Sequence, residues 1–167
     1  MKKETLGIDI GGVIIDRVKN DGTDTSFFTD NYLNTSAVQG AFGAINSLVV
    51  KRFVDRVYLV SKCGARIEAR TLHWLQHQRF YEIAAILPCN VRFCRERHQK
   101  AGICEKLGIT HFVDDRLDGD DVRRSAPDHV FGLGADGDYG AGLLVDRDDR
   151  GLVEHDAFAA HVDERVR

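Results

Sequence analysis

The chain has 167 residues and a hydrophobic content of 43%, which suits one globular domain with a proper core. Its formal net charge of −3 argues against broad electrostatic binding to nucleic-acid duplexes or anionic lipid surfaces. No apolar run approaches the roughly 20 residues that cross a bilayer, and the N-terminus lacks the apolar region of a signal peptide, so we expect a cytoplasmic protein without membrane association.

The cysteines are expected to be reduced, partly buried small residues. They are Cys63, Cys89, Cys94 and Cys104. No two of them form a CxxC pair, and no histidine pair at ligand spacing accompanies them, which argues against a zinc site.

The opening stretch TLGIDIGGVIID predicts a buried strand over residues 6–10 with Asp9 near its end, followed by a Gly-Gly turn and a second apolar run over 13–15. Ligands bind at the carboxyl ends of the strands in a parallel sheet, so Asp9 is placed at a candidate site. A turn carboxylate before two glycines also fits these residues. This stretch alone leaves both interpretations open.

Residues 17–36 are polar and rich in turn formers, which predicts an ordered loop or a small flap. In residues 37–53 the apolar side chains recur at helical spacing, with Ser36 as a candidate cap. We therefore expect a core-facing helix after the flap.

A second buried strand is predicted over residues 56–61, ending at Ser61 and followed by Lys62 and a turn at Gly64. Residues 65–78 then place their apolar side chains on one face, as an amphipathic helix does. The predicted order along the chain is therefore a strand, the hydroxyl group of Ser61 and an amphipathic helix.

A short helix over residues 81–87 and a third strand over 90–94 are expected next. Residues 99–107 predict a helix with Lys100 in its first turn. A cation opposes the helix dipole there, so a nearby anion or carboxylate would explain its position.

A fourth strand over residues 110–113 runs directly into Asp114, Asp115 and then Asp118. Carboxylates clustered at one strand end repel each other unless a cation lies among them. The cluster therefore predicts a cation site.

The remaining residues complete an α/β pattern. We expect a helix over 118–125, a strand over 129–133, a glycine-rich connection over 134–142, a small hairpin over 143–153 and a closing helix over 156–166. Strands alternating with helices imply a parallel sheet covered on both faces. The prediction is a single domain, residues 1–167, with a Rossmann-like three-layer sandwich around a mostly parallel five-stranded sheet.

Four segments of the chain together resemble the haloacid dehalogenase (HAD) phosphatase superfamily. They are LGIDIGGVIID, VYLVS, the lysine of RHQK and THFVDDRLD, in the order of that family's motifs. The resemblance implies a Mg²⁺-dependent phosphomonoesterase that forms an aspartyl-phosphate. About 40 residues separate the first two motifs, too few for a large cap, which implies a compact member of the superfamily.

The resemblance also implies roles for individual residues. Asp9 would be the nucleophile, and Ser61 and Lys100 would neutralise the transferred phosphoryl group. The metal ligands implied are Asp9, the Gly11 carbonyl, Asp114 and Asp115, with Asp118 a weaker candidate. The phosphate would contact Gly11, Gly12, Ser61, Lys62 and Lys100. Lys62 and Lys106 are alternatives to Lys100 as the lysine of the third motif.

The sequence departs from the family pattern at Gly11. Most phosphatases of the superfamily have a second Asp at this position, which protonates the leaving group and activates the water. Such proton transfer typically contributes about 10²- to 10⁴-fold in rate. We therefore expect activity that favours good leaving groups, or Asp16 or a flap residue in place of the missing acid.

Two other interpretations stay open. A non-catalytic phosphate- or nucleotide-binding module would keep the pocket and lack the proton shuttle at Gly11. The segment LGIDIGG also resembles the first phosphate-binding segment of sugar kinases of the actin-like ATPase class, but Val13 stands where a Thr usually follows, and the chain is far shorter than two actin-like lobes.

The expected substrate is a small phosphorylated metabolite or a nucleotide. With so short an insert, the site would be open, or closed by residues 17–36 or by a second subunit in a homodimer.

Overall fold

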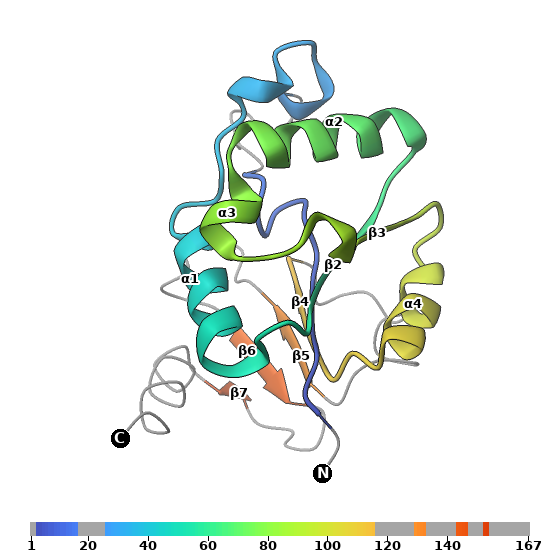
Figure 1. Ribbon diagram of the computed structural model, residues 1–167. Helices are drawn as coiled ribbons and strands as arrows, with labels where there is room; N and C mark the ends of the chain where they lie inside the picture. Colours follow the sequence, from blue (N-terminus) through green and yellow to red (C-terminus); the bar gives the residue numbers. More distant parts are fainter. Residues whose placement is uncertain (1–2, 17–25, 116–128, 133–142, 147–151, 154–167) are drawn as a thin grey trace.

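A seven-stranded sheet forms the centre of the structure, a computed structural model that describes residues 3–16, 26–115, 129–132, 143–146 and 152–153 (Figure 1). Across the sheet the strands are β3 (Val91–Cys94), β2 (Val57–Lys62), β1 (Leu6–Ile8), β4 (His111–Asp114), β5 (His129–Gly132), β6 (Leu143–Asp146) and β7 (Leu152–Val153). The strands from β3 to β5 are parallel to their neighbours, whereas β6 is antiparallel to β5, and β7 to β6. The expected α/β fold with a parallel sheet is confirmed.

The prediction of five strands is wrong. The antiparallel pair expected within residues 143–153 is present as β6 and β7. Because β6 also pairs with β5, both strands belong to the central sheet, which therefore has seven strands. An added antiparallel strand satisfies the backbone groups that an edge strand would leave unpaired. The helices predicted over 118–125 and 156–166 and the connection over 134–142 lie outside the described residues.

The helices predicted from apolar spacing are present within a few residues of their expected bounds. They are α1 (Ala41–Leu48), α2 (Ala65–His77), α3 (Phe80–Ala84) and α4 (Gln99–Leu107). Helix α1 begins later than expected, because Gly40 before it has a φ of 77° in the left-handed region. It then continues into a wider π-helical turn at Val49–Phe53.

The side chains of β2 alternate between two apolar clusters. Val57 and Leu59 belong to the larger one, together with Trp74 of α2. Val60 belongs to a second cluster with Cys104 of α4. Successive strand residues point to opposite faces, so α4 covers one face of the parallel strands while the other helices cover the opposite face.

The strand order places a topological switch between β1 and β4. The chain runs from β1 to β2 and β3, and then crosses to β4 on the other side of β1. In open α/β sheets the crevice at this point, outside the carboxyl ends of the strands, is where ligands bind. The residues that follow β1 and end β4 are Asp9 and Asp114.

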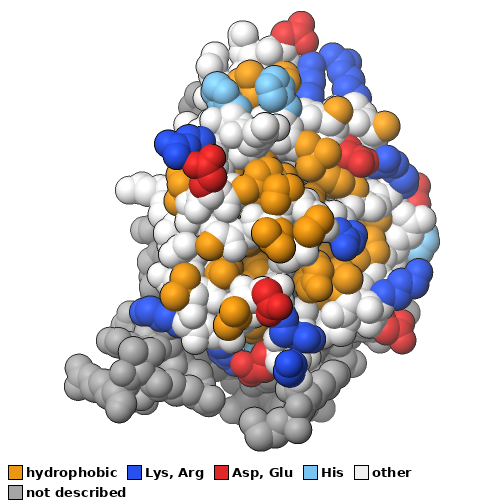
Figure 2. All heavy atoms as spheres, in the orientation of Figure 1, with side chains coloured by type: hydrophobic (Ala, Val, Ile, Leu, Met, Phe, Trp, Pro, Cys, Tyr) orange, Lys and Arg blue, Asp and Glu red, His pale blue; other side chains and the backbone are white. Residues whose placement is uncertain are grey.

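Apolar side chains also lie on the outer surface, on the face that carries α3 (Figure 2). The large exposed ones include Val50, Val54, Ile83 and Leu87. Val50, Val54 and Leu87 border a shallow hollow of about 420 Å³ beside the start of β2. In the part of the chain that the structure describes, no helix has the length and apolar character needed to cross a membrane.

Gly7 in β1 is required by the ring of Phe112 on β4. A Cβ at Gly7 would come within 2.5 Å of this ring. We expect Gly7→Ala to lower the free energy of unfolding by about 1–3 kcal/mol, the usual effect of overpacking a core. Urea denaturation measures the change.

The matched control is Gly43→Ala in α1, where a Cβ meets nothing within 4 Å. Alanine favours helix over glycine by up to about 1 kcal/mol, so this variant should be as stable as the wild type or more so. Equal stability of the two variants would contradict the close packing of β1 on β4.

Candidate functional site

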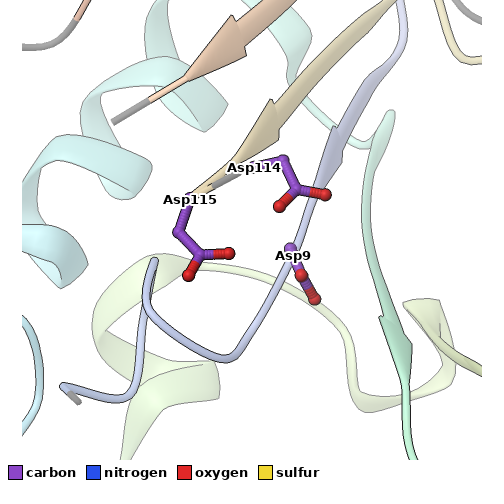
Figure 3. Close-up of side chains that lie close together, drawn as sticks. All are labelled: Asp9, Asp114 and Asp115. Carbon is purple, nitrogen blue, oxygen red and sulfur yellow. The ribbon is translucent and has the colours of Figure 1, made fainter. Parts of the chain in front are cut away.

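Three carboxylates meet at the carboxyl ends of β1 and β4 (Figure 3). Ile8 is paired with Val113 in the sheet, and the Asp9 backbone N–H donates to the Val113 carbonyl over 2.9 Å. This register brings Asp9 beside Asp114 and Asp115, and one carboxylate oxygen of each lies within 4.8 Å of the others. Residues about a hundred positions apart in the sequence thus form one acidic cluster.

Lys100 joins this cluster from the first turn of α4. Its Nζ lies 2.8 Å from Oδ2 of Asp9 and 3.1 Å from Oδ2 of Asp114. Burial by itself lowers the pKa of Lys100, but the two carboxylates and their hydrogen bonds outweigh burial and raise the pKa above its ordinary value. Lys100 is therefore charged at neutral pH, and the carboxylates explain why a cation lies near a helix N-terminus.

The charges of the cluster favour an additional cation. By formal charge, the three aspartates and Lys100 together carry two more negative than positive charges. Hard oxygen donors of this kind suit Mg²⁺. Asp9, Asp114 and Asp115 are therefore able to hold a metal ion, as expected from the sequence.

A pocket of about 390 Å³ opens over the cluster. Its lining joins the cluster to the end of β2, to α2 and to the flap: Asp9, Ile10, Gly11, Ile15, Asp16, Phe27, Phe28, Ser61, Lys62, Cys63, Gly64, Ile67, Thr71, Arg97, Lys100, Asp114 and Asp115. The structure thus brings Asp9, Gly11, Ser61, Lys62, Lys100, Asp114 and Asp115, all predicted from the sequence, to one cavity.

The N-terminus of α2 borders this pocket. β2 ends at Lys62, and α2 begins immediately after Gly64, which is its N-cap residue. The positive end of a helix dipole and its first backbone N–H groups attract anions. Ser61 is thus positioned where a phosphate would also meet the start of α2.

Gly12 lies in the tight turn after β1 and is not among the residues that line the pocket. Its backbone N–H donates to the Ile15 carbonyl over 2.9 Å, and its φ is 83°. A Cβ at Gly12 would collide with the carboxylate of Asp115. Gly12 therefore allows the tight turn and the close approach of Asp115, whereas Gly11 is the glycine that lines the pocket.

The other sequence candidates are distributed as follows. Lys106 is exposed near the end of α4 and borders a different hollow, which leaves Lys100 as the lysine in contact with Asp9. Asp16 lines the pocket. Asp118 lies outside the described residues.

One alternative from the sequence was that residues 17–36 cover the site, and within the described part of this segment Phe27 and Phe28 do line the pocket, although neither residue was singled out beforehand. This segment lies along α2 (Figure 1), where Arg70 donates to the carbonyls of Phe28 and Thr29 over 2.7 Å each. Trp74 Nε1 donates to the Thr35 carbonyl over 2.9 Å. Arg70 and Trp74 lie one turn apart on the buried face of α2. The sequence carried no signal of this, because an arginine in an amphipathic helix is ordinarily exposed.

Arg97 also lines the pocket and was missed. It is exposed and lies in the loop between β3 and α4, where the sequence also has the basic residues Arg95 and His98. Apolar spacing cannot identify which of these residues faces a cavity.

Cys63 lines the pocket as a neutral thiol. Burial and the charge of Glu68 raise its pKa to about 11, outweighing the opposing charge of Arg95. The thiolate is the nucleophilic form of cysteine, so Cys63 is inert near neutral pH.

We expect iodoacetamide to modify Cys63 slowly at pH 8, where about one thiol in a thousand is ionised. Because the pKa is raised to about 11, the rate should rise about tenfold per pH unit until the pH approaches this value. Peptide mass spectrometry of a Cys89→Ser variant, which lacks the exposed thiol, follows this rate. Rapid modification at pH 7 would show that the thiol is not buried as described.

We expect Lys100→Met to lower the free energy of unfolding at pH 7 by about 3–5 kcal/mol, because it leaves buried carboxylates without their cation. The matched control is Lys106→Met on the exposed side of α4, which should change stability by about 0.5 kcal/mol or less. Thermal and urea denaturation compare the two.

The stability that Lys100 contributes should also depend on pH. Because the pKa of Lys100 is raised in the folded state, this stability is complete below pH 10.5 and is lost as the pH rises through the raised pKa. The Lys100→Met variant should lack this alkaline loss.

The sequence was compared with models of known protein families and with curated proteins, and neither comparison finds a match.

Proposed function

We propose that this protein is a Mg²⁺-dependent phosphomonoesterase of the HAD type, with a Rossmann-like core and an aspartyl-phosphate intermediate. The supporting observation is that Lys100 bridges Asp9 and Asp114 at the switch point of the sheet, beside Asp115 and in one pocket with Ser61. A nucleophilic carboxylate, a fixed cation and a hydroxyl around one cavity are the groups that phosphoryl transfer needs.

In the first step, a carboxylate oxygen of Asp9 attacks phosphorus, the ester P–O bond breaks, and the alcohol leaves with its electron pair and takes up a proton. In the second step, water attacks phosphorus, and the P–O bond to Asp9 breaks to give inorganic phosphate and the free carboxylate. Lys100 orients Asp9 and neutralises phosphoryl oxygens, and Ser61 donates a hydrogen bond to them. Mg²⁺ held by Asp9, Asp114 and Asp115 would supply further neutralisation of phosphoryl charge.

The proton for the leaving group has no donor at Gly11. Asp16 lines the same pocket and is the carboxyl group available to carry it. The proposal therefore includes faster turnover of aryl phosphates, whose leaving groups need little protonation, than of alkyl phosphates. Equal rates on both would contradict this part.

The test is the release of inorganic phosphate from p-nitrophenyl phosphate with Mg²⁺ and with EDTA. We expect turnover with Mg²⁺, loss with EDTA and recovery when Mg²⁺ is restored. Acid quenching of a reaction with ³²P-labelled substrate should trap label on the protein, and hydroxylamine should release it, as expected of an acyl-phosphate. Turnover without a trapped acyl-phosphate on Asp9 would contradict the mechanism.

The second candidate is a phosphate- or nucleotide-binding module without catalysis, and the observation that favours it is the glycine at position 11. Isothermal titration with inorganic phosphate separates the two functions. Phosphate binding by a protein that turns over no ester would support the module.

Three further expectations belong to the proposal. The substrate is a small phosphorylated metabolite or nucleotide, the protein is cytoplasmic, and a homodimer is one way of covering the site. Size-exclusion chromatography with light scattering tests the last of these.

A further inference from the structure

One part of the pocket lining is apolar. Ile15 follows the turn after β1, Ile67 lies in the first turns of α2, and Phe27 and Phe28 come from the flap. A phosphoryl group has no use for such a surface, because its oxygens require donors and cations. This surface therefore faces another part of the ligand.

Phe28 is the exposed member of this surface. Its side chain is 57% exposed, whereas the adjoining Phe27 is 6% exposed. The two rings meet edge to face with centroids 6.3 Å apart, so the buried ring supports the exposed one. A large apolar ring left open to water in a pocket is typical of a ligand contact.

The backbone that carries Phe28 is firmly held. Arg70 Nη1 donates to the carbonyls of Phe28 and Thr29, and Arg70 Nη2 pairs with Asp30 Oδ1 at 2.9 Å. The Arg70 side chain is only 10% exposed and lies over the Tyr32 ring at 5.0 Å. The backbone at Phe28 is thus held in place before a ligand arrives, which reduces the entropy lost on binding.

We propose that the substrate is a phosphate monoester whose alcohol carries a planar aromatic ring, and that Phe28 determines this specificity by packing against the ring. The inference rests on the proposed function, since Asp9 and Lys100 in the same pocket take the phosphate. Ile67 completes the apolar contact from α2.

The test compares benzyl phosphate with cyclohexylmethyl phosphate. Both release a primary alcohol of similar basicity, so the comparison isolates the aromatic ring from the quality of the leaving group. Aromatic pairs contribute about 0.5–1.5 kcal/mol beyond buried area, so kcat/KM should favour benzyl phosphate by about threefold to tenfold. Phe28→Ala should remove this preference through a higher KM, and Phe28→Tyr should retain it.

The matched control is Leu87→Ala. Leu87 is 60% exposed and borders the separate hollow beside the start of β2. This variant should keep the preference for benzyl phosphate. A preference that survives Phe28→Ala, or that is lost equally in Leu87→Ala, would overturn the assignment of Phe28.

Binding of non-hydrolysable analogues separates this inference from the proposed function. Isothermal titration with benzylphosphonate and cyclohexylmethylphosphonate needs no turnover. Tighter binding of the benzyl compound that depends on Phe28, in a protein without phosphatase activity, would support the ring site and contradict the phosphatase. Turnover with equal affinity for both compounds would support the phosphatase and overturn the ring site.

Discussion

Replacement of Asp9 by Asn is expected to lower kcat for p-nitrophenyl phosphate by at least about 10⁴-fold, as the loss of a nucleophile does in other enzymes. The amide has the shape of the carboxylate but cannot form the acyl-phosphate. Lys100 keeps its contact with Asp114 at 3.1 Å, so the site should remain assembled. Steady-state phosphate release and the trapping of labelled protein measure the effect.

Asp55→Asn is the matched control for this substitution. Asp55 is exposed and borders the hollow beside the start of β2, away from the acidic cluster. It should have the kcat of the wild type. If Asp9→Asn and Asp55→Asn had equal phosphatase activity, Asp9 would not be the nucleophile. If the wild type and both variants were folded but showed no phosphatase activity, the binding module would be favoured.

Introducing a carboxyl group at Gly11 is expected to raise the turnover of an alkyl phosphate by about 10²-fold or more, because general acid catalysis typically contributes this much. Gly11 lines the pocket, and it is not among the glycines with positive φ in the described residues. The backbone there accepts a side chain without left-handed strain. Ethyl phosphate should gain more than p-nitrophenyl phosphate, whose leaving group needs little protonation.

Two variants control for the size and the place of the new side chain. Gly11→Asn has the same shape without an acid and should bring no gain. Gly12→Asp should lower stability, because Gly12 has a φ of 83° and adjoins Asp115. Equal gains from Gly11→Asp and Gly11→Asn would mean that the effect is not proton transfer.

Asp16→Asn in the wild type should slow the turnover of alkyl phosphates if Asp16 carries the proton.

Local patterns in the sequence predicted the parallel strands and the helices around the site. The apolar run ending at Asp9, the amphipathic spacing of α2 and the strand before Asp114 are features that neighbouring residues determine by themselves. The first residue of α1 differs from the predicted one because Gly40, with its left-handed backbone, changes the direction of the chain just before the helix. The hairpin over residues 143–153 was predicted, but its pairing with β5 was missed, because pairing between strands depends on residues that are distant in sequence.

Within the site, the sequence predicted the charged residues but not the apolar ones. Lys100 in the first turn of a helix was conspicuous, because a cation there is unfavourable without a partner. Phe27 and Phe28 looked like ordinary apolar residues of a polar loop. Their place at the pocket depends on Arg70, which lies more than 40 positions further along the chain.

The sequence by itself determined which residues could do chemistry: a carboxylate after an apolar strand, a hydroxyl before a helix, a lysine against the helix dipole and a pair of aspartates. Only the tertiary structure decided which of them meet. The order of the strands brings β1 beside β4, and the buried ion pairs then select Lys100 over Lys62 and Lys106. The physical reason is that side-chain chemistry is local, whereas the distance between two side chains is set by the packing of the whole sheet.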